Sequence, residues 1–125
     1  MSKQLMEVVL PRLARPLYRQ LKQYRAGRLD DAGFTRGFET LLRRQHAWLA
    51  RRGVPEIRAA LAIHGAVLIL SGPGLRAEAT ETGLPLEVVE YRAVAEAAAD
   101  VAANYGLNEK RAFKIISAIM ARYSD

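Results

Sequence analysis

The chain has 125 residues, of which 50% are hydrophobic and 26% are charged, and its formal net charge is +6. This balance is typical of a globular core, and no Ser- or Pro-rich linker divides the chain, so we expect residues 1–125 to form a single helical domain. The absence of cysteine excludes disulfides, thiolate zinc sites and thiol nucleophiles.

The first residues lack the continuous apolar stretch of a secretory signal, so a cytoplasmic location is expected. The most apolar run, residues 59–70, is shorter than the roughly 20 residues needed to cross a bilayer. We therefore expect it to form a buried helix, and we expect no membrane partner.

Positive charge is concentrated in the first half of the chain. Residues 1–58 hold 13 Lys or Arg against 5 Asp or Glu, which gives +8, whereas residues 59–125 hold 6 against 8, which gives −2. A basic half favours a polyanionic partner, either nucleic acid or an acidic protein surface. A solvated, arginine-rich surface with no specific partner is the alternative.

The first half predicts two amphipathic helices. Apolar residues recur every three or four positions over residues 5–26, where Pro11 and Pro16 predict a kink or a restart of the helix. Asp30 can cap a second helix, whose apolar stripe starts at Phe34 and ends at Leu49 before the break at Gly53.

The rest of the chain predicts three longer helices and one short one. Pro55 opens a helix over residues 57–70, the sequence at residues 71–74 (Ser-Gly-Pro-Gly) is expected to act as a linker, and a short helix is expected over 75–81. Residues 86–105 form a long helix, Gly106 ends it, and Asn108 can cap the last helix. We expect an all-α fold, a single compact bundle of five to six helices with 57–70 and 86–105 as its central pair, and we expect a homodimer.

The segment 98–117 resembles the helix-turn-helix of bacterial DNA-binding proteins. Ala102 stands four residues before Gly106, and Leu107 with the later Ala112 and Ile115 would fill the angle between the two helices. The resemblance implies an exposed recognition helix that reaches bases and phosphates, with these residues at its start and flank: Asn108, Lys110, Arg111 and Lys114. An ordinary helical hairpin joined by a glycine is the alternative.

A second basic element lies on the outer face of the first helix. Helical spacing puts four cations on the side opposite the leucine stripe, namely Arg12, Arg15, Arg19 and Lys22. Such a row can contact phosphates and release counterions. The alternatives are a solvated face and a face that meets the acidic residues of region 78–100.

Enzyme signatures are weak in this sequence. His46 and His64 lie on different predicted helices without metal-ligand spacing, so we expect no catalytic residue, no metal and no cofactor. His64 is expected to be a neutral core histidine with a backbone or carboxylate partner, and it could act as a base if a carboxylate of the long helix met it. A small-molecule site near His64 and Tyr91 is conceivable only as a pocket between helices.

The leading hypothesis is therefore a nonenzymatic protein that binds DNA or RNA, with phosphate contacts from the first helix and a helix-turn-helix-like element at 98–117. The alternative is a helical protein–protein interaction or scaffold module that does not bind nucleic acid.

Overall fold

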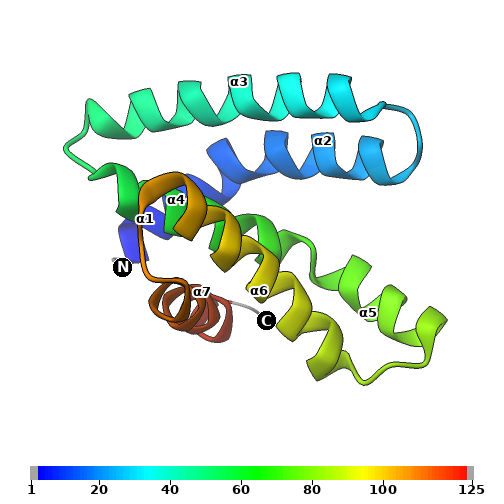
Figure 1. Cartoon of the computed structure of the whole chain (residues 1–125). Helices are drawn as coiled ribbons and strands as arrows, with labels where there is room; N and C mark the ends of the chain where they lie inside the picture. The colour runs from blue at the N-terminus through cyan, green and yellow to red at the C-terminus, as the bar shows by residue number, and fades with distance from the viewer. Residues whose placement is uncertain (1–2, 124–125) are drawn as a thin grey trace.

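The computed structural model describes residues 3–123, with side chains from residue 5 onward, and every regular element in that range is a helix (Figure 1). In chain order the elements are α1 (Lys3–Val8), the π-helix η1 (Val9–Ala14), α2 (Arg15–Arg25), α3 (Asp31–Ala50), α4 (Glu56–Leu70), α5 (Gly72–Thr82), α6 (Leu86–Tyr105) and α7 (Glu109–Tyr123). Because α1, η1 and α2 follow one another without a break, the described chain forms six helical rods. The predicted all-α bundle of five to six helices is confirmed.

The kink predicted at the two prolines is a π-helical segment. Pro11 lies inside η1 and Pro16 lies in the first turn of α2, where a missing backbone N–H costs least. The wider turns of η1 disturb the ordinary hydrogen-bond ladder. The buried side chain of Gln45 on α3 compensates, because its amide donates a hydrogen bond to the carbonyl of Leu13 in η1.

Helix α4 lies at the centre of the molecule and separates two apolar clusters. The first cluster joins α4 to the N-terminal helices, α3 and the end of α7, and its buried members are Met6, Val9, Leu13, Ala14, Leu17, Leu49, Ala59, Ala62, Ile63, Ala66 and Ile119. The second joins α4 to α6 and α7 and consists of Ala60, Leu61, Val94, Ala98, Val101, Ala112 and Ile116. Small side chains around α4 let neighbouring backbones approach it from both sides.

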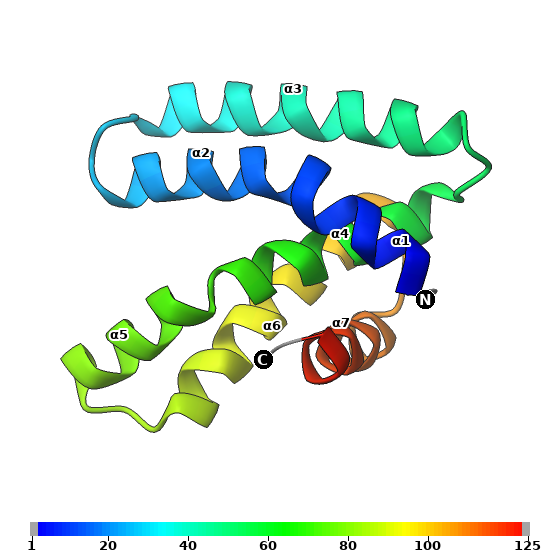
Figure 2. The same ribbon diagram turned by 180° about the vertical axis from the view of Figure 1, so that it is seen from behind.

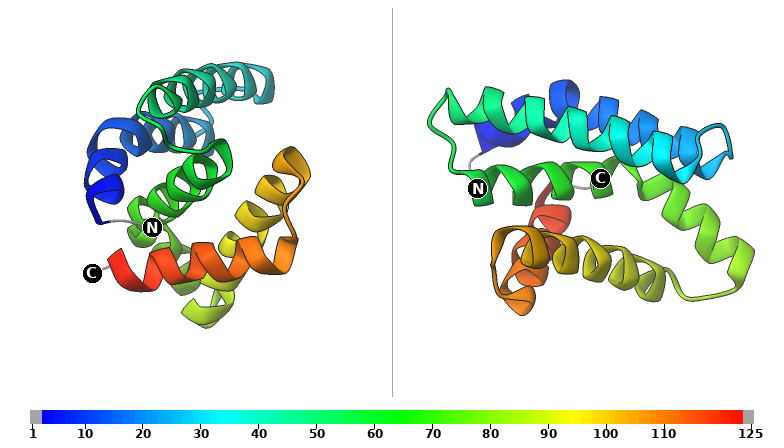
Figure 3. Two further views of the ribbon diagram at one scale, coloured as in Figure 1. Left: turned by 90° about the vertical axis from the view of Figure 1, so that its left-hand side faces the viewer. Right: turned by 45° about the horizontal axis from the view of Figure 1, so that its top comes forward.

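Two antiparallel helix pairs extend from this centre. Figure 1 shows α2 beside α3 and α5 beside α6, with α4 between the two pairs. Figure 2, from behind, shows α1 and η1 lying across α4. Helix α7 crosses α4 on the side opposite α2, as both views of Figure 3 show.

The linker predicted at residues 71–74 is wrong. Ser71 is buried and its hydroxyl donates to the carbonyl of Val67 at 2.8 Å, so the chain stays helical up to the bend. Gly72 to Gly74 form the first turn of α5, because a proline is accepted in the first turn of a helix. The break is a bend of 56° between α4 and α5 rather than a flexible connection.

The predicted central pair is right for α4 and wrong for α6. Helix α6 has the predicted bounds, 86–105, but it buries only four residues, Val89, Val94, Ala98 and Val101. Two of its larger apolar side chains stay exposed, Val88 at 39% and Tyr91 at 64%. Helix α6 therefore covers one side of α4 and keeps exposed apolar surface of its own.

The helix ends follow the predicted capping residues. The side chain of Asp30 accepts a hydrogen bond from the Gly33 amide at 2.7 Å, and that of Asn108 accepts one from the Arg111 amide at 3.1 Å. Gly106 ends α6 in the left-handed conformation, with φ of 65°.

No single helix within residues 3–123 is long and apolar enough to cross a membrane. Helices α4 and α5 would meet that test of length and composition only as a bent pair.

The closest approach of α7 to α4 occurs at Gly65. A Cβ atom built on Gly65 would lie 2.7 Å from Cγ2 of Ile119. The Gly65→Ala variant should therefore lose about 1–3 kcal/mol of unfolding free energy, because the cost of overpacking exceeds the helix propensity gained.

Urea denaturation followed by circular dichroism measures this loss. Gly74→Ala is the matched control: its Cβ would meet only Arg25 Nη1 at 3.9 Å, so this variant should be as stable as the wild type or slightly more stable. Equal stability of the two variants would show that α4 and α7 are not in tight contact.

Candidate functional site

The structure exposes all four cations predicted on the first helix. Arg12 lies on η1, and Arg15, Arg19 and Lys22 lie on α2, opposite the buried Leu17. The wider π-helical turns before Arg15 displace Arg12 around the axis from the row that the three α2 residues form. Three of the four cations therefore share one face, and Arg12 flanks it.

These cations have no carboxylate partner. Among the side chains of residues 5–123 the only ion pair is the one between His64 and Asp100, so none of the Arg or Lys side chains in that range is paired with a carboxylate. The Nζ atom of Lys22 lies 5.8 Å from the centroid of the Tyr18 ring, which places an aromatic ring beside the row. The row on α2 is thus a positive surface whose charge is not neutralised by this part of the chain.

The segment 98–117 joins α6 to α7 through a short turn at Gly106, an arrangement that fits both the helix-turn-helix and the ordinary helical hairpin. Gly106 takes the turn, Leu107 is half-buried, and Ala112 is buried between α6 and α7. Gly106 is exposed, so no other described helix covers the turn. The flanking residues Asn108, Lys110, Arg111 and Lys114 are all exposed.

The two basic elements do not form one surface. Helix α4 lies between α2 and α7, and the views in Figure 3 place the two basic helices on opposite sides of it. A single straight ligand would therefore contact one element or the other, whereas a long or bent one could reach both.

The two histidines of the chain lie on neighbouring helices, His46 on α3 and His64 in the middle of α4, and each contacts a residue of α6. His64 on α4 makes two hydrogen bonds, from Nδ1 to the carbonyl of Ala60 at 2.8 Å and from Nε2 to Oδ2 of Asp100 on α6 at 3.2 Å. Both partners are acceptors, so both bonds form at once only when both ring nitrogens carry hydrogen, and the expected neutral form can make only one of them. The predicted meeting with a carboxylate of the long helix occurs, and each ring nitrogen of His64 faces an acceptor.

Asp100 is held by two neighbours on opposite sides. The hydrogen bond from His64 lowers the pKa of Asp100 below its usual value, and the Asn104 amide, 3.2 Å from Oδ1, acts in the same direction. Asp100 therefore stays ionised and ties α6 to α4.

His46 on α3 contacts Tyr105 at the end of α6, a pairing that helical periodicity does not predict because 59 residues separate the two. The His46 Nε2 and Tyr105 Oη atoms are 3.0 Å apart. Burial lowers the pKa of His46 and raises the pKa of Tyr105, so both side chains are neutral near pH 7. The His46 Nδ1 atom is buried and has no hydrogen-bond partner among the described residues.

A recess of about 630 Å³ opens beside this pair, and its lining includes Glu39, Arg43, Glu56 and Asn104. No group of three or more His, Cys, Asp or Glu side chains in residues 3–123 is arranged to hold a metal ion. The geometry supports a hydrogen-bonded tie between α3 and α6 in which His46 and Tyr105 are the contacting groups.

The small-molecule site suggested near His64 and Tyr91 is wrong as a single site. His64 lines a narrow apolar cavity with Phe38 and Leu68, whereas Tyr91 faces α7 and lies 4.9 Å from the ring of Phe113. The two side chains line different cavities, since they lie on different sides of α6.

The lowered pKa of His46 makes stability depend on pH. The unfolded chain takes up a proton at the ordinary histidine pKa near 6.5, whereas the folded chain takes it up at lower pH. The stability contributed by neutral His46 is therefore complete above about pH 6.5 and is lost as the pH falls through the folded pKa. Asp100 adds a further loss only in more acidic solution, below its unfolded value of 3.8.

Between pH 7 and pH 5 the unfolding free energy of the His46→Gln variant should fall less than that of the wild type. Glutamine keeps a polar group near Tyr105 but does not titrate. Urea denaturation at several pH values measures the difference. His64→Gln is the control and should keep the contribution of His46. A His46→Gln profile parallel to that of the wild type would contradict this account.

The exposed cation row, the turn at Gly106 and the histidine contacts are all built from local and tertiary contacts of this chain. Comparison with models of known protein families, with curated proteins and with solved structures gives no match to it. Its function must therefore be argued from the geometry itself.

Proposed function

We propose that the protein binds nucleic acid without catalysing a reaction on it, and that α2 supplies the principal contact surface. One observation carries the proposal: Arg15, Arg19 and Lys22 project from one face of a well-packed helix and have no carboxylate partner within the described chain. Arg12 extends this surface at its edge. Cations without internal partners are free to bind external phosphates.

The spacing of the row suits a phosphate backbone. Steps of three and four residues separate its members by about 4.5–6 Å along the helix axis, given a rise of about 1.5 Å per residue. Each phosphate that is neutralised releases condensed counterions, and this release drives binding. Three or four such contacts predict a log–log salt slope of about −3 for duplex DNA.

The start of α7 offers a second set of contacts. Lys110, Arg111 and Lys114 are exposed beside the Gly106 turn, where the helix-turn-helix-like interpretation places base and phosphate contacts. Since α4 separates this set from the α2 row, each set is expected to contribute independently to binding.

The competing proposal is a protein interaction or scaffold module. Exposed carboxylates of α5 and α6, including Glu78, Glu87 and Glu96, also lack ion-pair partners among the described residues. The basic α2 of one copy could therefore face the acidic α5–α6 pair of another copy or of a different acidic protein. The predicted homodimer belongs to this proposal.

Fluorescence anisotropy with labelled duplex DNA and single-stranded RNA at 50 and 200 mM salt tests the leading proposal. The Arg15→Glu/Arg19→Glu double variant should weaken binding at least tenfold and reduce the salt slope by about 2, because two phosphate contacts are lost. Its helicity should equal that of the wild type, since both side chains are exposed.

Arg76→Glu/Arg122→Glu is the matched control, with the same change in net charge at exposed positions on α5 and α7. It should bind nearly as the wild type does. If both double variants weaken binding equally, the loss of affinity reflects net charge alone and contradicts a specific role for the α2 row. No binding by the wild type at 50 mM salt would refute the proposal. Sedimentation velocity at low salt then tests the competing one, which requires an assembly that the Arg15→Glu/Arg19→Glu variant disrupts.

A further inference from the structure

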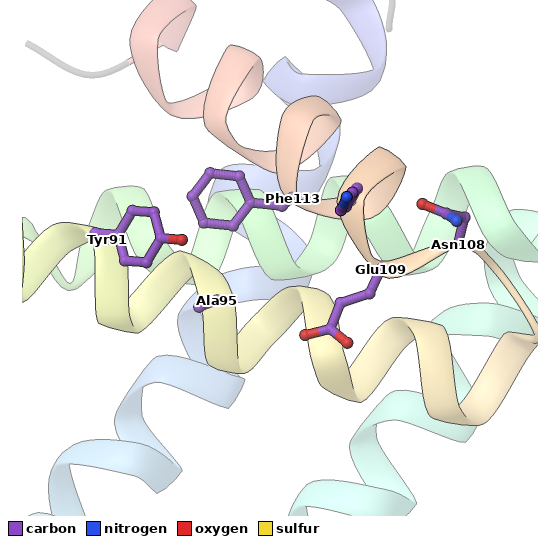
Figure 4. Close-up of a pocket in the computed structure, with 6 residues that line it drawn as sticks. Tyr91, Ala95, Asn108, Glu109 and Phe113 are labelled. Atoms are coloured by element: carbon purple, nitrogen blue, oxygen red, sulfur yellow. The ribbon is translucent and has the colours of Figure 1, made fainter.

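An open recess with an aromatic wall lies between α6 and the first turns of α7. Its volume is about 640 Å³, and Tyr91, Ala95, Asn108, Glu109, Lys110 and Phe113 line it. Figure 4 shows the rings of Tyr91 and Phe113 on one side of the recess and Glu109 and Asn108 on the other. The two ring centroids are 4.9 Å apart at an interplanar angle of 51°.

Tyr91 is the unusual residue of this recess. Its side chain is 64% exposed, the highest value among the exposed large hydrophobic side chains of the described chain. Ala95, one turn further along α6, is too small to cover the ring. The recess therefore presents an uncovered aromatic face beside which a flat group can lie.

The opposite wall of the recess carries hydrogen-bonding groups of both signs. Lys110 supplies donors and Glu109 supplies acceptors, and neither is part of an ion pair within residues 5–123. The Asn108 Oδ1 atom accepts a hydrogen bond from the Arg111 backbone amide at 3.1 Å, and the NH₂ group of the Asn108 side chain can donate to a ligand.

The two sides of the recess differ in charge. Tyr91 and Phe113 also line a neighbouring groove that contains Glu87 and Glu90, so the far side of the rings is acidic. On the α7 side the lining holds Glu109 and Lys110, and Arg111 and Lys114 follow on the same helix, so the first turns of α7 carry a net charge of +2. An anionic group on a ligand is therefore favoured at the α7 side of Tyr91.

We propose that this recess binds the base of an unpaired nucleotide. The base stacks against Tyr91, Glu109 accepts a hydrogen bond from an exocyclic amino group, and Lys110 contacts the phosphate. Adenine and cytosine, which carry such an amino group, are preferred over uracil. The nucleotide comes either from a single strand or from a free nucleoside monophosphate, since both present this chemistry.

The inference rests on the proposed nucleic-acid function and shares Lys110 with its second set of contacts, but it uses no residue of the α2 row. The recess and the α2 row lie on opposite sides of α4, so a variant at one site leaves the other intact. The two sites also respond to different properties of the ligand, because the row senses phosphate charge and the recess senses the base.

Four probes separate these contributions: a 12-mer of deoxyadenosine, a 12-mer of the same charge with abasic sites at every position, AMP and UMP. Binding is measured at 200 mM salt by anisotropy for the labelled strands and by calorimetry for the monophosphates. We expect the adenine strand to bind more tightly than the abasic strand, and AMP more tightly than UMP.

The Tyr91→Ala variant should lose about 5- to 150-fold in affinity for the adenine strand, which is the range expected for one stacked base, and should bind both strands equally. Tyr91→Phe keeps the ring and should keep the preference. Arg15→Glu/Arg19→Glu should weaken both strands by the same factor and preserve the preference for adenine.

Several results would decide against one proposal or the other. Equal binding of the adenine and abasic strands by the wild type, or no effect of Tyr91→Ala, overturns the base site and leaves the α2 proposal standing. If Tyr91→Ala abolishes AMP binding but the α2 variant does not weaken the binding of either strand, the result supports the recess and overturns the α2 proposal. If the wild type is a dimer without a base preference and Tyr91→Ala converts it to a monomer, the recess binds a second copy of the chain and the base site is overturned.

Discussion

Alanine and glycine residues on several sides of α4 allow helices from both halves of the chain to pack directly against α4. Ala59, Ala62 and Ala66 face the N-terminal helices, Ala60 faces α6, and Gly65 meets α7. Close packing of this kind requires both the small volume and the apolar character of these residues. The arrangement of the outer helices, and hence of every exposed group, depends on it.

A central helix whose buried residues are all apolar leaves the charged groups at the surface, because ionised groups are expensive to bury without partners. The basic residues of the first half therefore project from α2 and α3, and the acidic residues of the second half project from α5 and α6. His64 is the one polar side chain in the interior part of α4, and acceptors at Ala60 and Asp100 face its two ring nitrogens. The positive charge of the first half is thus carried mainly by α2 and α3, but the two signs are not fully separated in space, because Lys110, Arg111 and Lys114 lie on α7 and Arg25 lines a recess with Glu78 and Glu96.

Local signals in the sequence predicted the helices, whereas contacts between distant helices could not be derived from it. The bounds of α6 and the cap at Asn108 follow from flanking residues, so they were predictable. The helical start of α5 is not predicted because the turn-forming residues of segment 71–74 suggest a break, whereas the buried Ser71 bonds to Val67 one turn earlier and Pro73 fits the first turn of α5. The His46–Tyr105 contact and the recess at Tyr91 depend on the rotation of one helix against another, which periodicity does not specify. The exposure of the four cations could be predicted from the helical period alone, since it does not depend on a contact with another helix.

The central claim is that the cation row of α2, left unpaired by the packing around α4, is the surface that meets phosphate. An NMR titration of the ¹⁵N-labelled protein with a single-stranded RNA oligonucleotide at low salt tests it most directly. The account predicts the largest changes at the backbone amides and arginine Nε signals of Arg15 and Arg19 and at the amide of Lys22, fading as salt is raised. Changes confined to α5 and the acidic start of α6, or no change at low salt, would contradict it.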